Sequence, residues 1–158
     1  QERASEEPAE VVEEVHHDVD PPADDPWAVN IEELTVGNEN YRLAVWTGEY
    51  IQLALMTLQP GERIDLELHD NHDQFIRIEE GEAQVLMGKE QDNMTFDKIV
   101  GDDWAILIPA GYYHEVINTG DTDLKLYTVY GPPEHMPRTL HKTYAEAEHD
   151  HHDHDHDH

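Results

Sequence analysis

Apolar and polar residues alternate with a period of two along most of the chain after residue 26. This spacing is typical of β-strands that bury one face, because successive side chains in a strand point to opposite sides. Glycine, proline, asparagine and aspartate separate the runs, and no helix-length run lies between them. Many short, closely spaced strands indicate an all-β sandwich or barrel, with an enlarged hairpin loop at residues 88–95. The predicted strands cover residues 41–46, 51–58, 64–69, 74–80, 83–87, 104–108, 113–117 and 124–130.

The two ends of the chain differ in composition from this middle part. Residues 1–26 contain ten acidic residues and one basic residue, end in a proline-rich stretch and offer few apolar side chains, so we predict a disordered acidic arm. Residues 149–158 consist only of histidine and aspartate and cannot form a core. We therefore predict an arm at 1–26, a β-barrel domain at 27–145 and a His/Asp-rich tail at 146–158.

The net charge of −28, from 37 acidic and 9 basic residues, limits the possible partners. A field of this sign repels phosphate backbones and anionic lipid and attracts cations, so we expect neither nucleic acid nor a membrane as a partner. The absence of cysteine excludes disulfides, thiolate ligands and cysteine nucleophiles. No run approaches the roughly 18 apolar residues of a membrane span. We expect a cytoplasmic protein, with an exported mature form as the alternative because the chain begins with Gln1.

Candidate metal ligands first occur in residues 61–81. Glu67 and His69 are two residues apart in a predicted strand, so a carboxylate and an imidazole project from the same face. After a short turn, Gln74 is in phase with Ile76 and Ile78, which mark the buried face of the next strand. A polar amide on that face needs a partner.

A further candidate ligand lies about forty residues later. Pro109 and Gly111 form a turn signal that leads into a strand whose inward positions begin with His114 and continue with Val116. If both stretches belong to one barrel, His114 meets Glu67 and His69 in its interior.

The two stretches resemble the paired motifs of the cupin superfamily, and the resemblance covers about residues 40–130. In the first motif, the places of a glycine, two histidines, a glutamate and a second glycine are held by Gly61, Glu67, His69, Gln74 and Gly81. In the second motif, the matching residues are Pro109, Gly111, His114 and Asn118, and the opening glycine falls on Asp103. Residues 126–135 and 140–143 are similar to a bacterial cupin subgroup labelled mannose-6-phosphate-isomerase-like, for which the family supplies no firm activity.

The resemblance implies a double-stranded β-helix, or jelly-roll barrel, that holds one divalent metal ion through Glu67, His69, Gln74 and His114. Glu67 replaces the usual first histidine and Gln74 the usual glutamate, so the carboxylate has moved within the set. Two imidazoles and one carboxylate suit Fe(II), with Mn(II), Zn(II) or Ni(II) as rivals. Gln74 would be a weak fourth ligand or a donor behind the ligands, and His72 on the turn is its alternative. A pocket that holds water instead of metal is the alternative to the whole site.

Apolar residues in the predicted strand 64–69 indicate a partner subunit. Ile64, Leu66 and Leu68 alternate with polar positions that include both ligands. An apolar face turned away from the pocket needs a second cover, which in cupins is commonly another subunit or a terminal arm. We therefore predict a homodimer.

Three functions remain open from the sequence. The first is a metal-dependent enzyme that acts on a small oxygenated molecule, since dioxygenase and isomerase chemistry both fit this kind of fold. The second is a non-catalytic protein that binds metal or a small ligand, with the tail collecting metal. The third is a structural or assembly module with contacts through the acidic ends. The tail itself is compatible with an engineered tag, a solubilising segment or a natural metal-collecting segment.

Overall fold

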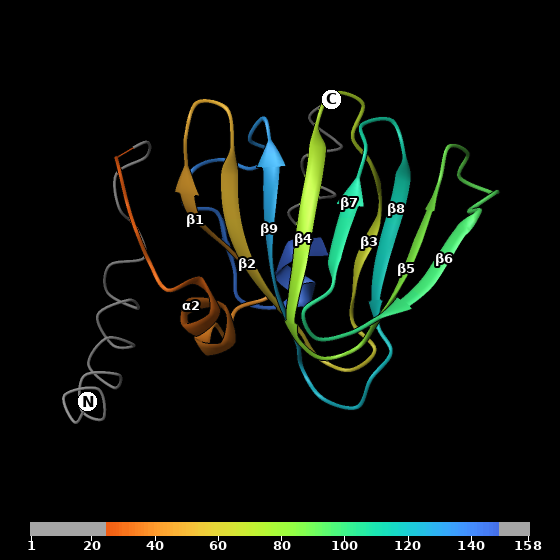
Figure 1. The fold of residues 1–158 in the computed structure, drawn as a ribbon, viewed down its shortest axis with the longest axis horizontal. Coiled ribbons are helices and arrows are strands. Elements are labelled where there is room, and N and C mark those ends of the chain that lie inside the picture. Colours follow the sequence, from red (N-terminus) through yellow and green to blue (C-terminus); the bar gives the residue numbers. More distant parts are fainter. Residues whose placement is uncertain (1–24, 149–158) are drawn as a thin grey trace.

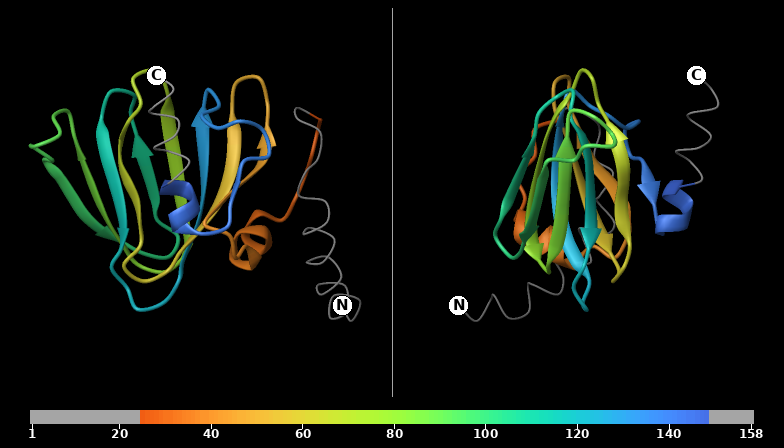
Figure 2. Two further views of the ribbon diagram at one scale, coloured as in Figure 1. Left: turned by 180° about the vertical axis from the view of Figure 1, so that it is seen from behind. Right: turned by 90° about the vertical axis from the view of Figure 1, so that its right-hand side faces the viewer.

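The structure is a computed structural model that describes residues 25–148. Within this range, ten strands form two antiparallel sheets that face each other as a jelly roll (Figure 1, Figure 2). Most of the predicted tail at 146–158 and most of the predicted arm at 1–26 lie outside the described residues. The strands are β1 (Arg42–Thr47), β2 (Gln52–Leu58), β3 (Arg63–Leu68), β4 (Asp73–Glu80), β5 (Ala83–Gly88), β6 (Phe96–Val100), β7 (Ala105–Ile108), β8 (Tyr113–Asn118), β9 (Leu124–Gly131) and β10 (Leu140–His141).

The core lies between the two sheets. The larger sheet has the strand order β10-β1-β2-β9-β4-β7, and the smaller has the order β3-β8-β5-β6. Met56, Leu126 and Ile78 form one buried row across neighbouring strands of the larger sheet, and Val85 and Val116 of the smaller sheet belong to the same core. Full burial of each such side chain stabilises the fold by about 1.5–3 kcal/mol. This core fixes the orientation of the polar side chains that share the inward faces.

The eight strands predicted from the alternation are confirmed, each with ends within one residue of the prediction. The predicted hairpin loop at 88–95 is also confirmed, since it joins β5 to β6. The alternation does not reveal β6 or the two-residue β10. Four of the five residues of β6 are exposed, so this edge strand has no buried face that could produce a pattern.

One short helix, α2 (Ile31–Gly37), covers part of the outer face of the larger sheet (Figure 1). The side chain of Asn30 caps its first turn by accepting a hydrogen bond of 3.0 Å from the Glu33 N–H. Leu34 is 5% exposed and packs with Val45 and Leu55. No helix within residues 25–148 combines the length and the apolar character needed to span a membrane.

The chain also packs on the barrel after β10. Residues 144–148 are helical and lie beside β3 (Figure 2). The Tyr144 hydroxyl donates to the carboxylate of Asp65, and the Tyr144 ring lies 5.4 Å from the ring of Tyr41. Ala147 is buried within the core. Packing against the barrel therefore continues to this residue.

β3 contains a bulge that changes which of its side chains face inward. Ile64 is opposite Val116 and Glu67 is opposite His114, so β3 has one residue more than β8 between the two pairs. As a result, Ile64 and Glu67 both face the interior, although three positions separate them. The prediction that Ile64 lies on the outer face with Leu66 and Leu68 is therefore wrong, since Ile64 is 2% exposed and belongs to the core.

Asp103 holds a backbone conformation that favours glycine. Its φ angle is +72°, in the left-handed region, and its N–H donates to the carbonyl of Ile78 at 2.8 Å. This is the place of the opening glycine in the second motif. Aspartate is among the residues that tolerate the left-handed region, so the departure from the motif keeps the turn.

Candidate metal centre

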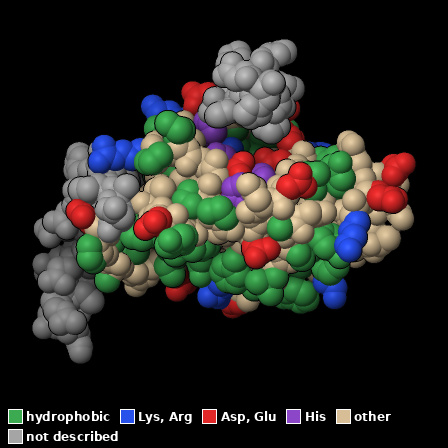
Figure 3. Space-filling model, turned by 90° about the horizontal axis from the view of Figure 1, so that it is seen from above, with side chains coloured by type: hydrophobic (Ala, Val, Ile, Leu, Met, Phe, Trp, Pro, Cys, Tyr) green, Lys and Arg blue, Asp and Glu red, His purple; other side chains and the backbone are tan. Residues whose placement is uncertain are grey.

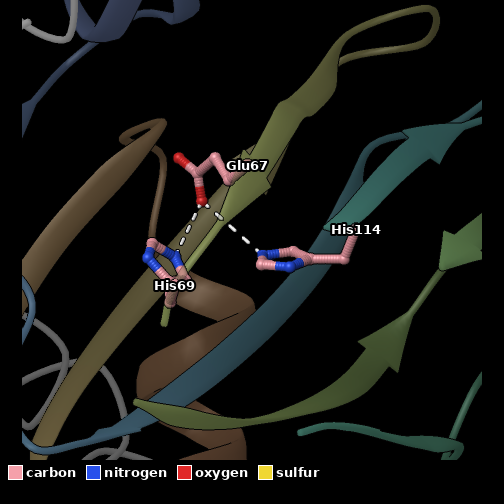
Figure 4. Close-up of side chains that lie close together, drawn as sticks. All are labelled: Glu67, His69 and His114. Carbon is pink, nitrogen blue, oxygen red and sulfur yellow. Dashed lines mark hydrogen bonds and ion pairs between the residues drawn. The ribbon is translucent and has the colours of Figure 1, made fainter. Parts of the chain in front are cut away.

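Glu67, His69 and His114 come together inside one end of the barrel (Figure 4). Glu67 and His114 are directly opposite each other on β3 and β8, and His69 follows the end of β3. Glu67 Oε1 is 3.2 Å from His69 Nε2 and 3.6 Å from His114 Nε2. One ligand atom from each of the three residues lies within 4.8 Å of the others, which is close enough for one ion.

The orientation of the His114 ring presents a lone pair to this centre. Its Nδ1 is 3.2 Å from the carbonyl oxygen of Tyr112. Because a carbonyl only accepts hydrogen bonds, Nδ1 carries the proton and Nε2 of the neutral ring is an acceptor. Nε2 is fully buried, has no hydrogen-bond partner among the described residues, and faces the Glu67 carboxylate. Two buried acceptors that face each other need a cation between them.

The electrostatics of the centre also favour a cation. Burial alone would raise the pKa of Glu67, but the hydrogen bond with His69 and the charge of Arg42 hold that pKa well below its usual range. Burial alone would lower the pKa of His69, but the carboxylates of Glu67 and Glu134 raise it. A site that draws a proton onto His69 has a negative potential, and a divalent ion would compete for the same place.

Gln74 approaches from the other sheet, as predicted from its phase in β4. It is 4% exposed, and its Nε2 donates to the Thr128 hydroxyl at 3.0 Å. Its Oε1 is buried and has no hydrogen-bond partner among the described residues. An inward amide oxygen without a partner is suited to be the weak fourth ligand that the sequence predicts.

His72 lies at the same end of the barrel, in a second group that the sequence does not reveal. Its Nε2 is 3.1 Å from Glu134 Oε1, and His69 Nδ1 is 3.5 Å from the same oxygen. These three residues are also close enough to share an ion. Figure 3 shows histidine side chains gathered near the centre of this end of the molecule, next to acidic side chains. No alternation or motif in the sequence singles out Glu134, because it lies in the segment that follows β9.

A buried cation, Arg42, is the other site residue that the sequence analysis missed. It lies on β1, is 6% exposed, and its Nη1 is 3.2 Å from Nδ1 of His141. Burial disfavours its charge, but nearby Tyr130, Tyr41, Glu67 and Glu134 raise the pKa of the guanidinium. Period two marks an inward position at the start of β1, and an arginine there is the signal that could have found it.

A family model and the sequence relatives define the family of this chain. The model of the cupin domain matches residues 54–130, which include all four predicted ligands. The uncharacterized protein L612 of Acanthamoeba polyphaga mimivirus is 44% identical over 112 residues, which are 70% of this chain and 68% of L612. The chain belongs to the cupin superfamily. A second relative of this cupin, the uncharacterized protein YrkC of Bacillus subtilis (strain 168), is 52% identical over 122 residues, which are 77% of this chain and 66% of YrkC.

A solved structure supports the same fold for this cupin. The crystal structure of BH2720 from Bacillus halodurans matches with a TM-score of 0.79 and 51% identity, over 80% of this chain and 96% of that one. The chain spans about two thirds of the length of both sequence relatives.

Proposed function

We propose that this cupin is a metal-dependent enzyme that acts on a small oxygenated molecule, with one divalent ion held by Glu67, His69 and His114. The observation that carries the proposal is the buried Nε2 of His114, whose lone pair faces the Glu67 carboxylate at 3.6 Å. The unpartnered Oε1 of Gln74 gives further support as a weak fourth ligand. Two imidazoles and a carboxylate suit Fe(II), and Mn(II), Zn(II) or Ni(II) are the rivals.

The ion, when bound, would supply a Lewis acid or a redox centre with positions open to substrate. The chain supplies the rest of the site. His114 is held in one tautomer by the Tyr112 carbonyl, and Glu134 lies beside the outer nitrogen of His69. The apolar residues Ile76 and Ile108 line the interior near the ligands and exclude water. Dioxygenase and isomerase reactions both fit this arrangement, and membership of the mannose-6-phosphate-isomerase-like subgroup is part of the proposal.

Metal analysis of the full-length chain tests the proposal. A tail variant, in which the six histidines of residues 149–158 are replaced by asparagine, removes metal binding by the histidines of the tail. It is loaded separately with Fe(II), Mn(II), Zn(II) and Ni(II), desalted and analysed for metal. We expect about one retained ion per chain, its loss in Glu67→Gln, and its retention in the control His72→Asn.

Two results would reject this assignment. A tail variant that retains no metal would leave a tail-based metal binder, which is the non-catalytic alternative. Loss of the ion in His72→Asn with retention in Glu67→Gln would move the ion to the group of His69, His72 and Glu134. Oxygen uptake by the Fe(II)-loaded chain, with small hydroxy acids and sugars as candidate substrates, then separates oxygenase from isomerase activity.

We also propose a homodimer, on revised grounds. Ile64 is buried in the core and does not contribute to an outer apolar face, whereas Leu68 is 37% exposed. Trp104 and Leu107 are 46% and 68% exposed at the β7 edge of the larger sheet, and large exposed apolar side chains at a sheet edge favour contact with another chain. Light scattering of the chain and of Leu107→Glu tests this proposal, since we expect a dimer that the substitution dissociates. A monomeric wild type would contradict it.

A further inference from the structure

We propose that Arg42 binds the carboxylate of a small anionic substrate inside the barrel. This inference rests on the proposed function, because it assigns a substrate class to the same metal centre. Arg42 is 6% exposed, and its Nε is fully buried with no hydrogen-bond partner among the described residues. No carboxylate of residues 25–148 lies within 4.0 Å of its guanidinium. A buried cation with a free donor is costly unless an anion completes it.

A continuous series of polar rings connects Arg42 to the metal centre. The His69 ring is 6.4 Å from the Tyr130 ring, and Tyr130 is 5.3 Å from His135. His135 is 6.5 Å from His141, whose Nδ1 is 3.2 Å from Arg42 Nη1. Arg42 therefore belongs to the same interior as the ligands.

The residues between Arg42 and the ligand end of the sheet are small. Ala44, Ala54 and Thr128 form one row across β1, β2 and β9, and each is buried. This row lies between the row that begins with Arg42 and the row that contains Gln52 and Tyr130. A single row of small, closely packed side chains therefore separates Arg42 from the row that holds Tyr130.

The charges of the interior also select an anion. Without metal, Arg42 is outnumbered by Glu67 and Glu134, which give a net charge of −1 for these three groups. A divalent ion changes the net charge to +1, so an anion is favoured only once the ion is bound. A carboxylate suits the position because its two oxygens match two adjacent N–H groups of a guanidinium. Binding of the carboxylate should therefore depend on both the metal and Arg42.

The test measures binding of glycolate to the Mn(II)-loaded tail variant. Relaxation of the glycolate methylene protons by Mn(II) reports a ligand next to the ion and needs no turnover. We expect the Mn(II)-induced relaxation of glycolate to saturate as glycolate concentration rises, and glycolamide, which is neutral, to show little relaxation. We expect no relaxation of a bound ligand in metal-free protein. In Arg42→Met the glycolate affinity should fall about tenfold or more, while Mn(II) is retained. The matched control, Arg63→Met, removes an arginine that pairs with Glu115 on the same barrel and should bind glycolate as wild type does.

Arg42→Lys covers the case in which Arg42→Met does not fold. This substitution keeps the charge and loses the bidentate donor, so we expect a severalfold weaker affinity for glycolate than in the wild type. Equal glycolate affinity in the wild type and in the Arg42 variants would overturn the inference, as would equal binding of glycolamide or a preference for inorganic phosphate. A wild type that retains Mn(II) but binds no glycolate overturns only this inference, whereas failure to retain Mn(II) overturns the proposed function with it.

Discussion

His69 Nδ1 lies 3.5 Å from Glu134 Oε1, while the other ring nitrogen, Nε2, is 3.2 Å from Glu67. A carboxylate beside Nδ1 favours a proton on that atom and leaves the lone pair on Nε2, toward the metal centre. Carboxylates in this position orient metal-binding histidines and increase their basicity. Glu134 therefore acts on the proposed ion through His69, and it can be tested separately from the ligands.

Glu134→Gln should weaken metal binding by about tenfold without abolishing it, because the amide orients His69 less strongly than the carboxylate does. Competition with a chelating dye for Zn(II), in the tail variant, measures this change. Glu115→Gln is the matched control, since Glu115 is paired with Arg63 at 2.8 Å. Unchanged affinity in Glu134→Gln would show that the contact with His69 has no role, and complete loss would make Glu134 a ligand.

Gln74→Glu should strengthen metal binding by about tenfold or more, because it places a second carboxylate where a buried Oε1 has no partner. The same change should lower the free energy of unfolding of the metal-free protein by about 1–3 kcal/mol, since it buries a charge. Zn(II) competition and urea unfolding with and without metal measure the two effects.

Gln52→Glu is the control for this substitution. Gln52 is also buried, but its amide nitrogen donates to Thr47 and its amide oxygen accepts from the N–H groups of Glu134 and His135. Gln52→Glu should therefore destabilise the fold with no gain in metal affinity. If Gln74→Glu behaves in the same way, Gln74 does not face the ion.

Asp103→Gly should leave the free energy of unfolding within about 0.5 kcal/mol of the wild type. Glycine relieves the left-handed φ of +72° but loses the exposed ion pair of 2.8 Å with Arg77, and the two effects are of similar size. Asp103→Ala should destabilise by about 1–2 kcal/mol, because alanine loses the ion pair and keeps the strain. Urea unfolding of both variants checks this difference, and equal stabilities would contradict a strained backbone at this position.

Stability should fall as the pH drops below about 6.5, in part because of His135. Burial and the charge of Arg42 lower the pKa of His135 to about 3. Between pH 3 and 6.5 the unfolded chain binds the proton and the folded chain does not, so protonation favours unfolding. Between pH 6.5 and 4, the free energy of unfolding of His135→Asn should therefore fall by about 1–2 kcal/mol less than that of the wild type. The effect is limited to this size because the His135 ring keeps some contact with solvent. Urea unfolding at a series of pH values measures this, and parallel curves would contradict it.

The positions that sequence reasoning could predict are those where one strand carries the information. Ile76 and Ile78 set the phase of β4, so the inward direction of Gln74 follows from its spacing alone, and the structure agrees. The i and i+2 relation of Glu67 and His69 is equally local, and their side chains meet as expected. The place of His114 opposite Glu67 needed the motif resemblance, because nothing in either stretch specifies how β3 pairs with β8.

The remaining parts depend on contacts between distant segments. Glu134 lies after β9 and reaches the centre only because the chain turns back over the barrel end, where His72 is already present. Arg42 is inward only because β1 pairs with β2 and β10 in the observed register. Strict alternation puts Ile64 on the wrong face because it cannot anticipate the bulge in β3.

This bulge separates the ligand end of β3 from its core end. Since one surplus residue lies between Ile64 and Glu67, removal of Leu66 would shorten the strand while both residues stay opposite Val116 and His114. Removal of Leu68 would instead turn His69 to the outside, because no surplus residue exists there to absorb the loss. The bulge can thus absorb a change in the length of the strand, and natural or engineered changes in length are best tolerated in β3 between these two pairs.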